Sequence, residues 1–97
     1  MRRAAKIDDN QVAIVTALRQ IGTDVLSLAA IGKGCPDLLC YRAPIGYTLL
    51  EIKDGDKSPS RRRLTEDQVR WHAHWRGPVH IVASVDEAIR AVTGQRL

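Results

Sequence analysis

The segment 47–53, which reads YTLLEIK, constrains the fold of this chain more than any other part of it. Its β-branched and aromatic residues favour a strand. Side chains alternate faces along a strand, so Glu51 and Lys53 share one face while Leu50 and Ile52 share the other. The run is too apolar for a solvated edge, and a charge inside a buried run usually has a partner or a function. The pattern therefore predicts a buried strand that carries two functional charges.

A second apolar run, residues 35–41, reads CPDLLCY and comes just before the first. Asp37 is in phase with Leu39 and Tyr41 along this run. The connection from Tyr41 to Tyr47 is short enough for a hairpin that returns beside it. We therefore expect Asp37 and Glu51 to meet across the two strands.

Two carboxylates held about 4 Å apart repel by roughly 4 kcal/mol at an effective dielectric near 20. A divalent cation offsets this repulsion, and oxygen ligands favour Mg²⁺ or Mn²⁺. Such an ion activates water and neutralises charge on a phosphate, while Lys53 can orient the water or stabilise the charge. Taken singly, Pro36-Asp37 is a common turn and Glu51-x-Lys53 a common pair on a solvated strand. Together they favour a metal-dependent phosphodiester nuclease.

Four segments carry a family resemblance: residues 32–39 (GKGCPDLL), 49–55 (LLEIKDG), 64–68 (LTEDQ) and 75–77 (WRG). They resemble the VRR-NUC branch of the PD-(D/E)XK nuclease superfamily, in its small stand-alone phage and prophage form. The resemblance implies an α-β-β-β-α-β core and cleavage of branched DNA, including four-way (Holliday) junctions. It implies that Asp37, Glu51 and the carbonyl of Ile52 hold Mg²⁺ or Mn²⁺. It also implies that Lys53 is the catalytic lysine and that Gln68 belongs to the active site.

One departure from the family concerns the first helix, where relatives often carry a glutamate. The aligned position is Ala13, and Gln11 nearby is also uncharged. Asp9 lies one turn before Ala13 and can project toward the same side, because residues four apart share a helix face. As an N-cap of the helix, which is the more common role, Asp9 would not reach the site. The number of metal ions is therefore open.

The chain has 97 residues and a net charge of +4 at pH 7, which predicts one small domain. Basic residues gather directly after the predicted catalytic strand, and such a stripe attracts phosphate backbones. In an arbitrary protein it would more often only confer solubility. Here we expect Lys33, Lys57, Arg61, Arg62 and Arg63 to bind nucleic acid.

The remaining pattern predicts a mixed α/β fold with a closing helix. The first helix is expected to begin with a capping box formed by Asp8 and Gln11 and to end at Gly22. Two more helices are expected over 65–75 and 85–93. Strands are expected at 25–28 and 79–83, with a turn at 32–34. Gln68 is spaced to complete a second capping box with Thr65, so its role is open between cap and active site. Trp71 and Trp75 are expected in the core rather than stacked on DNA.

Cys35 and Cys40 are expected on opposite faces of one strand, as small core residues in a reducing cytosol. The histidines do not match a zinc site. No secretion signal or membrane-spanning run is visible, so a cytoplasmic protein of a bacterial or phage-infected cell is expected.

A domain this small favours a homodimer, and two sites about a two-fold axis would match a symmetric junction. The apolar stripe of the closing helix is the expected interface, with packing on the sheet as the alternative. The stripe contains Val85, Ala88, Ile89 and Val92. The rival function is a nuclease-fold DNA-binding module without activity. An interaction domain that does not bind nucleic acid is a third possibility.

Overall fold

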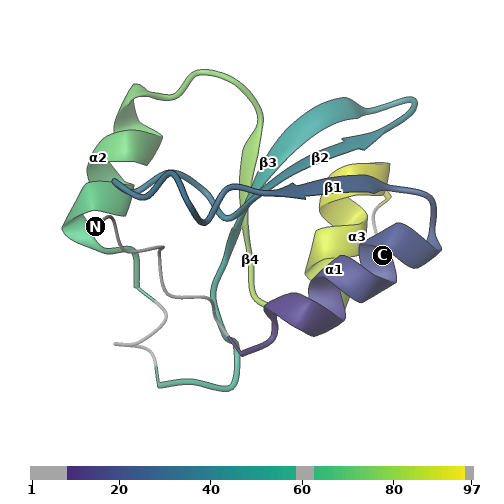
Figure 1. Ribbon diagram of the computed structural model, residues 1–97, viewed down its shortest axis with the longest axis horizontal. Helices are drawn as coiled ribbons and strands as arrows, with labels where there is room; N and C mark the ends of the chain where they lie inside the picture. The colour runs from purple at the N-terminus through teal and green to yellow at the C-terminus, as the bar shows by residue number, and fades with distance from the viewer. Residues whose placement is uncertain (1–8, 59–62, 96–97) are drawn as a thin grey trace.

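The computed structural model describes residues 9–58 and 63–95, and its elements follow the order α-β-β-β-α-β-α (Figure 1). This order confirms the mixed α/β fold predicted from the sequence. The helices are α1 (Gln11–Gln20), α2 (Glu66–His74) and α3 (Val85–Thr93). The strands are β1 (Asp24–Ser27), β2 (Leu38–Arg42), β3 (Gly46–Ile52) and β4 (Val79–Val82). No helix in these described ranges is long and apolar enough to cross a membrane.

The four strands form one sheet in the order β1-β2-β3-β4. β1 pairs antiparallel with β2, and β2 pairs antiparallel with β3 through the predicted hairpin, in which Tyr41 lies opposite Tyr47. β3 and β4 are parallel. Parallel neighbours need a long crossover, usually a helix, and α2 lies within it. The crossover therefore brings α2 back past the end of β3, where the charged residues lie.

The core lies between one face of the sheet and the pair α1 and α3, which run side by side in Figure 1. Leu50 and Ile52 of β3 point into it, as alternation predicts, and α1 contributes Ile14 and Leu18. Each of these four side chains is fully buried.

The apolar stripe of α3 belongs to this core, so the dimer interface expected there was wrong and packing on the sheet is confirmed. Ala88 and Val92 are buried, and Val85 and Ile89 pack against the core cluster. The helix begins at the N-cap Ser84, whose hydroxyl accepts a hydrogen bond from the backbone N–H of Glu87. It ends at Gly94 in the left-handed conformation, a common helix C-terminus.

The start of α1 differs from the expectation. Its N-cap is Asn10, not Asp9, and Asp8 of the predicted capping box lies outside the described residues. Asn10 makes no side-chain cap; its Nδ2 donates to the backbone carbonyls of Lys53 and Ala83, both at 3.2 Å. This amide therefore ties α1 to the ends of β3 and β4, a long-range use of a polar residue that capping statistics cannot foresee.

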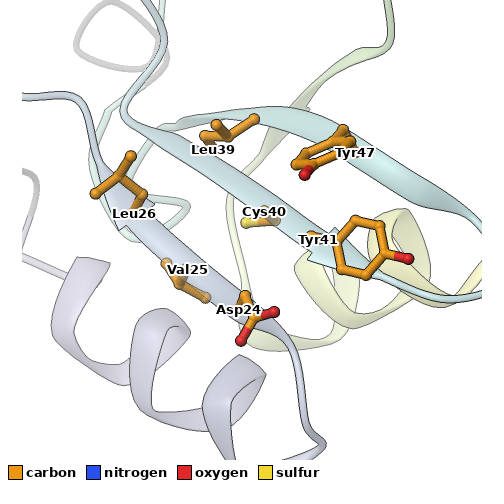
Figure 2. Close-up of a pocket in the computed structure, with 7 residues that line it drawn as sticks. All are labelled: Asp24, Val25, Leu26, Leu39, Cys40, Tyr41 and Tyr47. Atoms are coloured by element: carbon orange, nitrogen blue, oxygen red, sulfur yellow. The ribbon is translucent and has the colours of Figure 1, made fainter.

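The opposite face of the sheet carries exposed apolar side chains. Leu26 is 58 % exposed and Tyr47 is 66 % exposed, and Tyr41 packs against Tyr47 with ring centroids 4.8 Å apart. Figure 2 shows these side chains around a hollow of about 400 Å³ over β1, β2 and the start of β3. Asp24 is the charged residue in its lining.

α2 is attached to the molecule without burying any of its own residues. Trp71 is half-buried and Trp75 is 44 % exposed, and the two rings stack on each other at 4.8 Å. The expectation that both tryptophans lie in the core was therefore wrong. Their spacing of four brings the two rings together on the helix surface. The stacked rings shield part of each other's apolar surface from water without burial in the core.

Candidate functional site

The two predicted acids lie at one site. Continuing the pairing of Leu38 with Leu50 by one residue places Asp37 opposite Glu51. Both line a hollow of about 310 Å³ between the start of β2, the end of β3 and the first turn of α2. Glu51 is only 1 % exposed, whereas Asp37 is half-buried. The hairpin thus brings together two carboxylates that are fourteen positions apart in sequence.

Asp37 also contacts the backbone of β3. Its Oδ2 accepts a hydrogen bond of 2.7 Å from the backbone N–H of Ile52. One residue further back, Pro36 lies opposite Ile52 in the continued register and has no N–H to donate to the Ile52 carbonyl. Asp37 and Glu51 line the hollow, whereas Ile52 is not among its lining residues. Carboxylate and carbonyl oxygens are the ligands that suit Mg²⁺ or Mn²⁺. The predicted ligands are thus of the right chemical type, and the metal site stays a prediction.

Lys53 lies on the same side as Glu51 and lines the same hollow. Its side chain is directed by Gln68, because Nζ donates to Gln68 Oε1 at 2.8 Å. Lys53 is 9 % exposed as a residue, and a charged group in such surroundings needs a partner of this kind. A lysine held this way presents a fixed positive charge to the hollow.

Gln68 is at once a helix cap and part of the site. Its Oε1 accepts from the backbone N–H of Thr65 at 2.9 Å, and the Thr65 hydroxyl accepts from the backbone N–H of Gln68 at 3.2 Å, which completes the predicted capping box. The same side chain donates from Nε2 to Glu51 Oε2 at 3.2 Å. The alternatives left open by the sequence are therefore compatible. The cap fixes the amide, and the amide bridges Lys53 and Glu51.

The other oxygen of Glu51 contacts His72, one turn further along α2. His72 Nε2 lies 3.3 Å from Glu51 Oε1, and the His72 side chain is 15 % exposed. Burial, and then the positive charge of Lys53, lower the pKa of His72 below its usual value. An ionised carboxylate can only accept, so in this contact Nε2 is the donor.

The turn at 32–34 packs directly on the start of α2. Gly32, Lys33 and Gly34 all have positive φ angles, of 68°, 56° and 80°. A side chain at Gly34 would collide with the backbone of Asp67 and would lie 2.7 Å from the backbone nitrogen of Gln68. Glycine therefore permits both the turn and the close approach that sets the position of Gln68.

The predicted nucleic-acid-binding residues are only partly drawn together. Lys33 is exposed and lines the hollow with Asp37 and Glu51. Lys57 contacts Asp9 Oδ2 at 3.0 Å. Arg63 is exposed, whereas Arg61 and Arg62 lie outside the described residues.

No acid from α1 reaches the site in the described part of the chain. Ala13, the position aligned to the family glutamate, is exposed and does not face the hollow. Asp9 is also exposed and pairs with Lys57, so the alternative in which it replaces that glutamate was wrong. Its expected role as an N-cap was wrong as well. Gln11, by contrast, is buried, at 6 % exposed.

The two cysteines differ more than the sequence suggested. Cys40 lies in the core, and burial raises the pKa of its thiol to about 11. Cys35 precedes β2 and lines the hollow, so the expectation that it is a core residue of the same strand was wrong. Burial raises the pKa of the Cys35 thiol, with further contributions from the charges of Glu51 and Asp37. Both thiols are free.

Comparisons of the chain with protein-family models, with curated proteins and with solved structures give no match. Within the described ranges, no group of three or more His, Cys, Asp and Glu side chains could hold a metal ion. The ligand set considered above instead combines the side chains of Asp37 and Glu51 with a backbone carbonyl.

Two residues that contact Glu51 or the backbone of Lys53 were not predicted from the sequence. His72 had a readable signal, because it follows Gln68 by four residues on the same helix face. Asn10 had none, since its partners Lys53 and Ala83 are 43 and 73 positions away.

Proposed function

We propose that the protein is a metal-dependent endonuclease that hydrolyses phosphodiester bonds in branched or structured DNA. The observation that carries the proposal is the hollow shared by Asp37, Glu51 and Lys53, in which two of the three charged side chains are almost fully buried. Burying charges is costly unless their function requires it or partners offset it. The preference for branched DNA, including four-way junctions, comes from the VRR-NUC resemblance.

Asp37, Glu51 and the Ile52 carbonyl would hold Mg²⁺ or Mn²⁺ at this site. A bound ion of this kind acts as a Lewis acid toward the phosphate and lowers the pKa of the attacking water. Lys53, held by Gln68, presents its ammonium group to the hollow and stabilises charge that develops on the phosphate oxygens. The water forms a new bond to phosphorus and loses a proton, the bond to the leaving oxygen breaks, and that oxygen takes up a proton.

One cleavage panel tests the proposal. The full chain is incubated with Mg²⁺, Mn²⁺ or EDTA and with a four-way junction, a flap, a linear duplex and a single strand of related sequence. We expect cleavage with either metal, none with EDTA, and the fastest rate on the junction or the flap. Metal-dependent cleavage that is equal on all four substrates would refute the preference for branched DNA. The absence of cleavage on all four would refute the proposal that the protein is a nuclease.

The second candidate function is a DNA-binding module that retains the fold without activity. It is favoured by one specific observation, which is that α1 supplies no acid to the site: Ala13 is exposed and Asp9 pairs with Lys57. Junction binding without cleavage in the same panel would select this candidate.

Basic residues that follow β3 in the sequence would hold the DNA backbone. We expect that changing Arg61, Arg62 and Arg63 together to Ala weakens binding to every DNA structure. The dependence of log K on log salt should flatten by up to roughly 0.9 for each phosphate that the protein no longer neutralises. Fluorescence anisotropy over a series of salt concentrations measures this slope. An unchanged slope would mean that the three arginines only increase solubility, and an altered structure preference would give them a role in selecting the substrate.

A homodimer remains part of the proposal, but its interface must differ from the one predicted on α3. The open sheet face around Leu26, Tyr41 and Tyr47 is apolar and exposed, and it is the surface we propose for a second copy. Sedimentation at micromolar concentration should give a dimer for the wild type and a folded monomer for Tyr47→Asp. A wild-type monomer would contradict the dimer, and a dimeric Tyr47→Asp protein would contradict its location.

A further inference from the structure

Glu51 is a deeply buried carboxylate whose two oxygens are both contacted by one helix. Gln68 donates to Oε2 at 3.2 Å, and His72 Nε2 lies 3.3 Å from Oε1. Residues four apart on a helix project from the same face, so α2 presents the two groups as a pair. This pair fixes the rotation of the carboxylate as well as its position.

The two donors contact different oxygens of Glu51, and only one of them lines the hollow. Gln68 lines the hollow together with Asp37 and Lys53, whereas His72 is not among the lining residues. His72 therefore contacts Glu51 without lining the hollow in which a phosphate would bind. A group in this position does not touch substrate and acts on the reaction only through Glu51.

We propose that His72 is a positioning residue that orients Glu51 for metal binding. This inference rests on the proposed function, because it concerns the same ligand. An imidazole that donates from Nε2 to Oε1 restricts the rotation of the carboxylate. Hydrogen-bonded partners of this kind orient metal ligands, and their loss typically lowers metal affinity or activity by 10- to 100-fold.

Of the two histidines in α2, His72 contacts Glu51 and His74 does not. His74 lies two residues further along the helix, is exposed, and contacts the Arg70 carbonyl through Nδ1 at 2.8 Å. It therefore provides a matched control: the same residue type in the same helix, bonded to the helix backbone instead of Glu51.

The test is calorimetric titration of the full chain with MnCl₂ alone, without DNA. Four proteins are compared: wild type, His72→Phe, which keeps a ring without the donor, His72→Gln, which restores an amide donor, and His74→Phe. We expect Mn²⁺ affinity to fall about 10-fold or more in His72→Phe, to recover to within a few-fold in His72→Gln, and to be unchanged in His74→Phe. Thermal midpoints of the four proteins, measured in parallel, report whether each variant folds.

The outcomes separate this inference from the function on which it rests. If the wild type binds Mn²⁺ and His72→Phe binds it equally well, His72 has no positioning role while the metal site stands. Equal losses in His72→Phe and His72→Gln would also overturn the donor role. If His72→Phe does not fold, the comparison of His72→Gln with the wild type decides, since a loss beyond a few-fold contradicts the proposal. A wild-type protein that binds no Mn²⁺ overturns both the metal site and the role of His72.

Discussion

Replacing Glu51 by Gln is expected to abolish DNA cleavage while the fold and DNA binding persist. The substitution removes a negative metal ligand but keeps the shape of a side chain that is only 1 % exposed. DNA binding should be retained or strengthened, because one charge that repels phosphate is removed. Cleavage of a labelled junction at saturating Mn²⁺, with anisotropy for binding, measures both properties. Cleavage within a factor of a few of the wild-type rate would exclude Glu51 as a ligand.

A surface substitution of the same chemistry provides the control. The Glu66 side chain is 94 % exposed at the start of α2, so Glu66→Gln should leave the cleavage rate essentially unchanged. Asp37→Asn should behave like Glu51→Gln. The double variant should lose little more activity than either single variant, because groups that act as a unit are not additive. Additive losses would mean that the two acids act separately.

Gly34→Ala is expected to displace α2 and, with it, the two side chains that hold Glu51. A β-carbon at this position would collide with the backbone of Asp67, and backbone yields less readily than the end of a side chain. Overpacking of this kind costs about 1–3 kcal/mol, in addition to about 1–2 kcal/mol for a left-handed alanine. Tryptophan fluorescence reports the displacement directly, since both tryptophans of the chain, Trp71 and Trp75, belong to α2 or its C-cap.

Gly32 provides a control for the backbone conformation. Its φ is 68°, against 80° for Gly34, but a β-carbon there would meet nothing within 4 Å. Gly32→Ala should therefore show only the conformational cost in denaturant unfolding, with a wild-type fluorescence spectrum. Equal effects of the two substitutions would show that the close approach of Gly34 to α2 does not matter, and that the left-handed turn alone accounts for the destabilisation.

Local rules were sufficient wherever a residue's partner is fixed by the chain itself. Alternation along β3 separated Glu51 from Leu50 and Ile52, because a strand turns successive side chains to opposite faces. The short connection between β2 and β3 brought Asp37 to Glu51, since a hairpin determines which residues pair. The capping box at Thr65 followed from helix geometry in the same way.

Tertiary structure decided the rest, because local patterns specify which side chains are apolar or polar but not which surface meets them. The stripe of α3 was equally suited to a dimer interface and to the sheet, and only the packing of α1 and α3 together assigned it to the core. Trp75 has a large apolar side chain of the kind often found in a core. It is nevertheless 44 % exposed, because α2 buries none of its residues. The crossover that carries α2 past the end of β3 also brings His72 to Glu51, which is 21 positions away in sequence. The hydrogen bond between them gives His72 a role that the neighbouring sequence does not reveal.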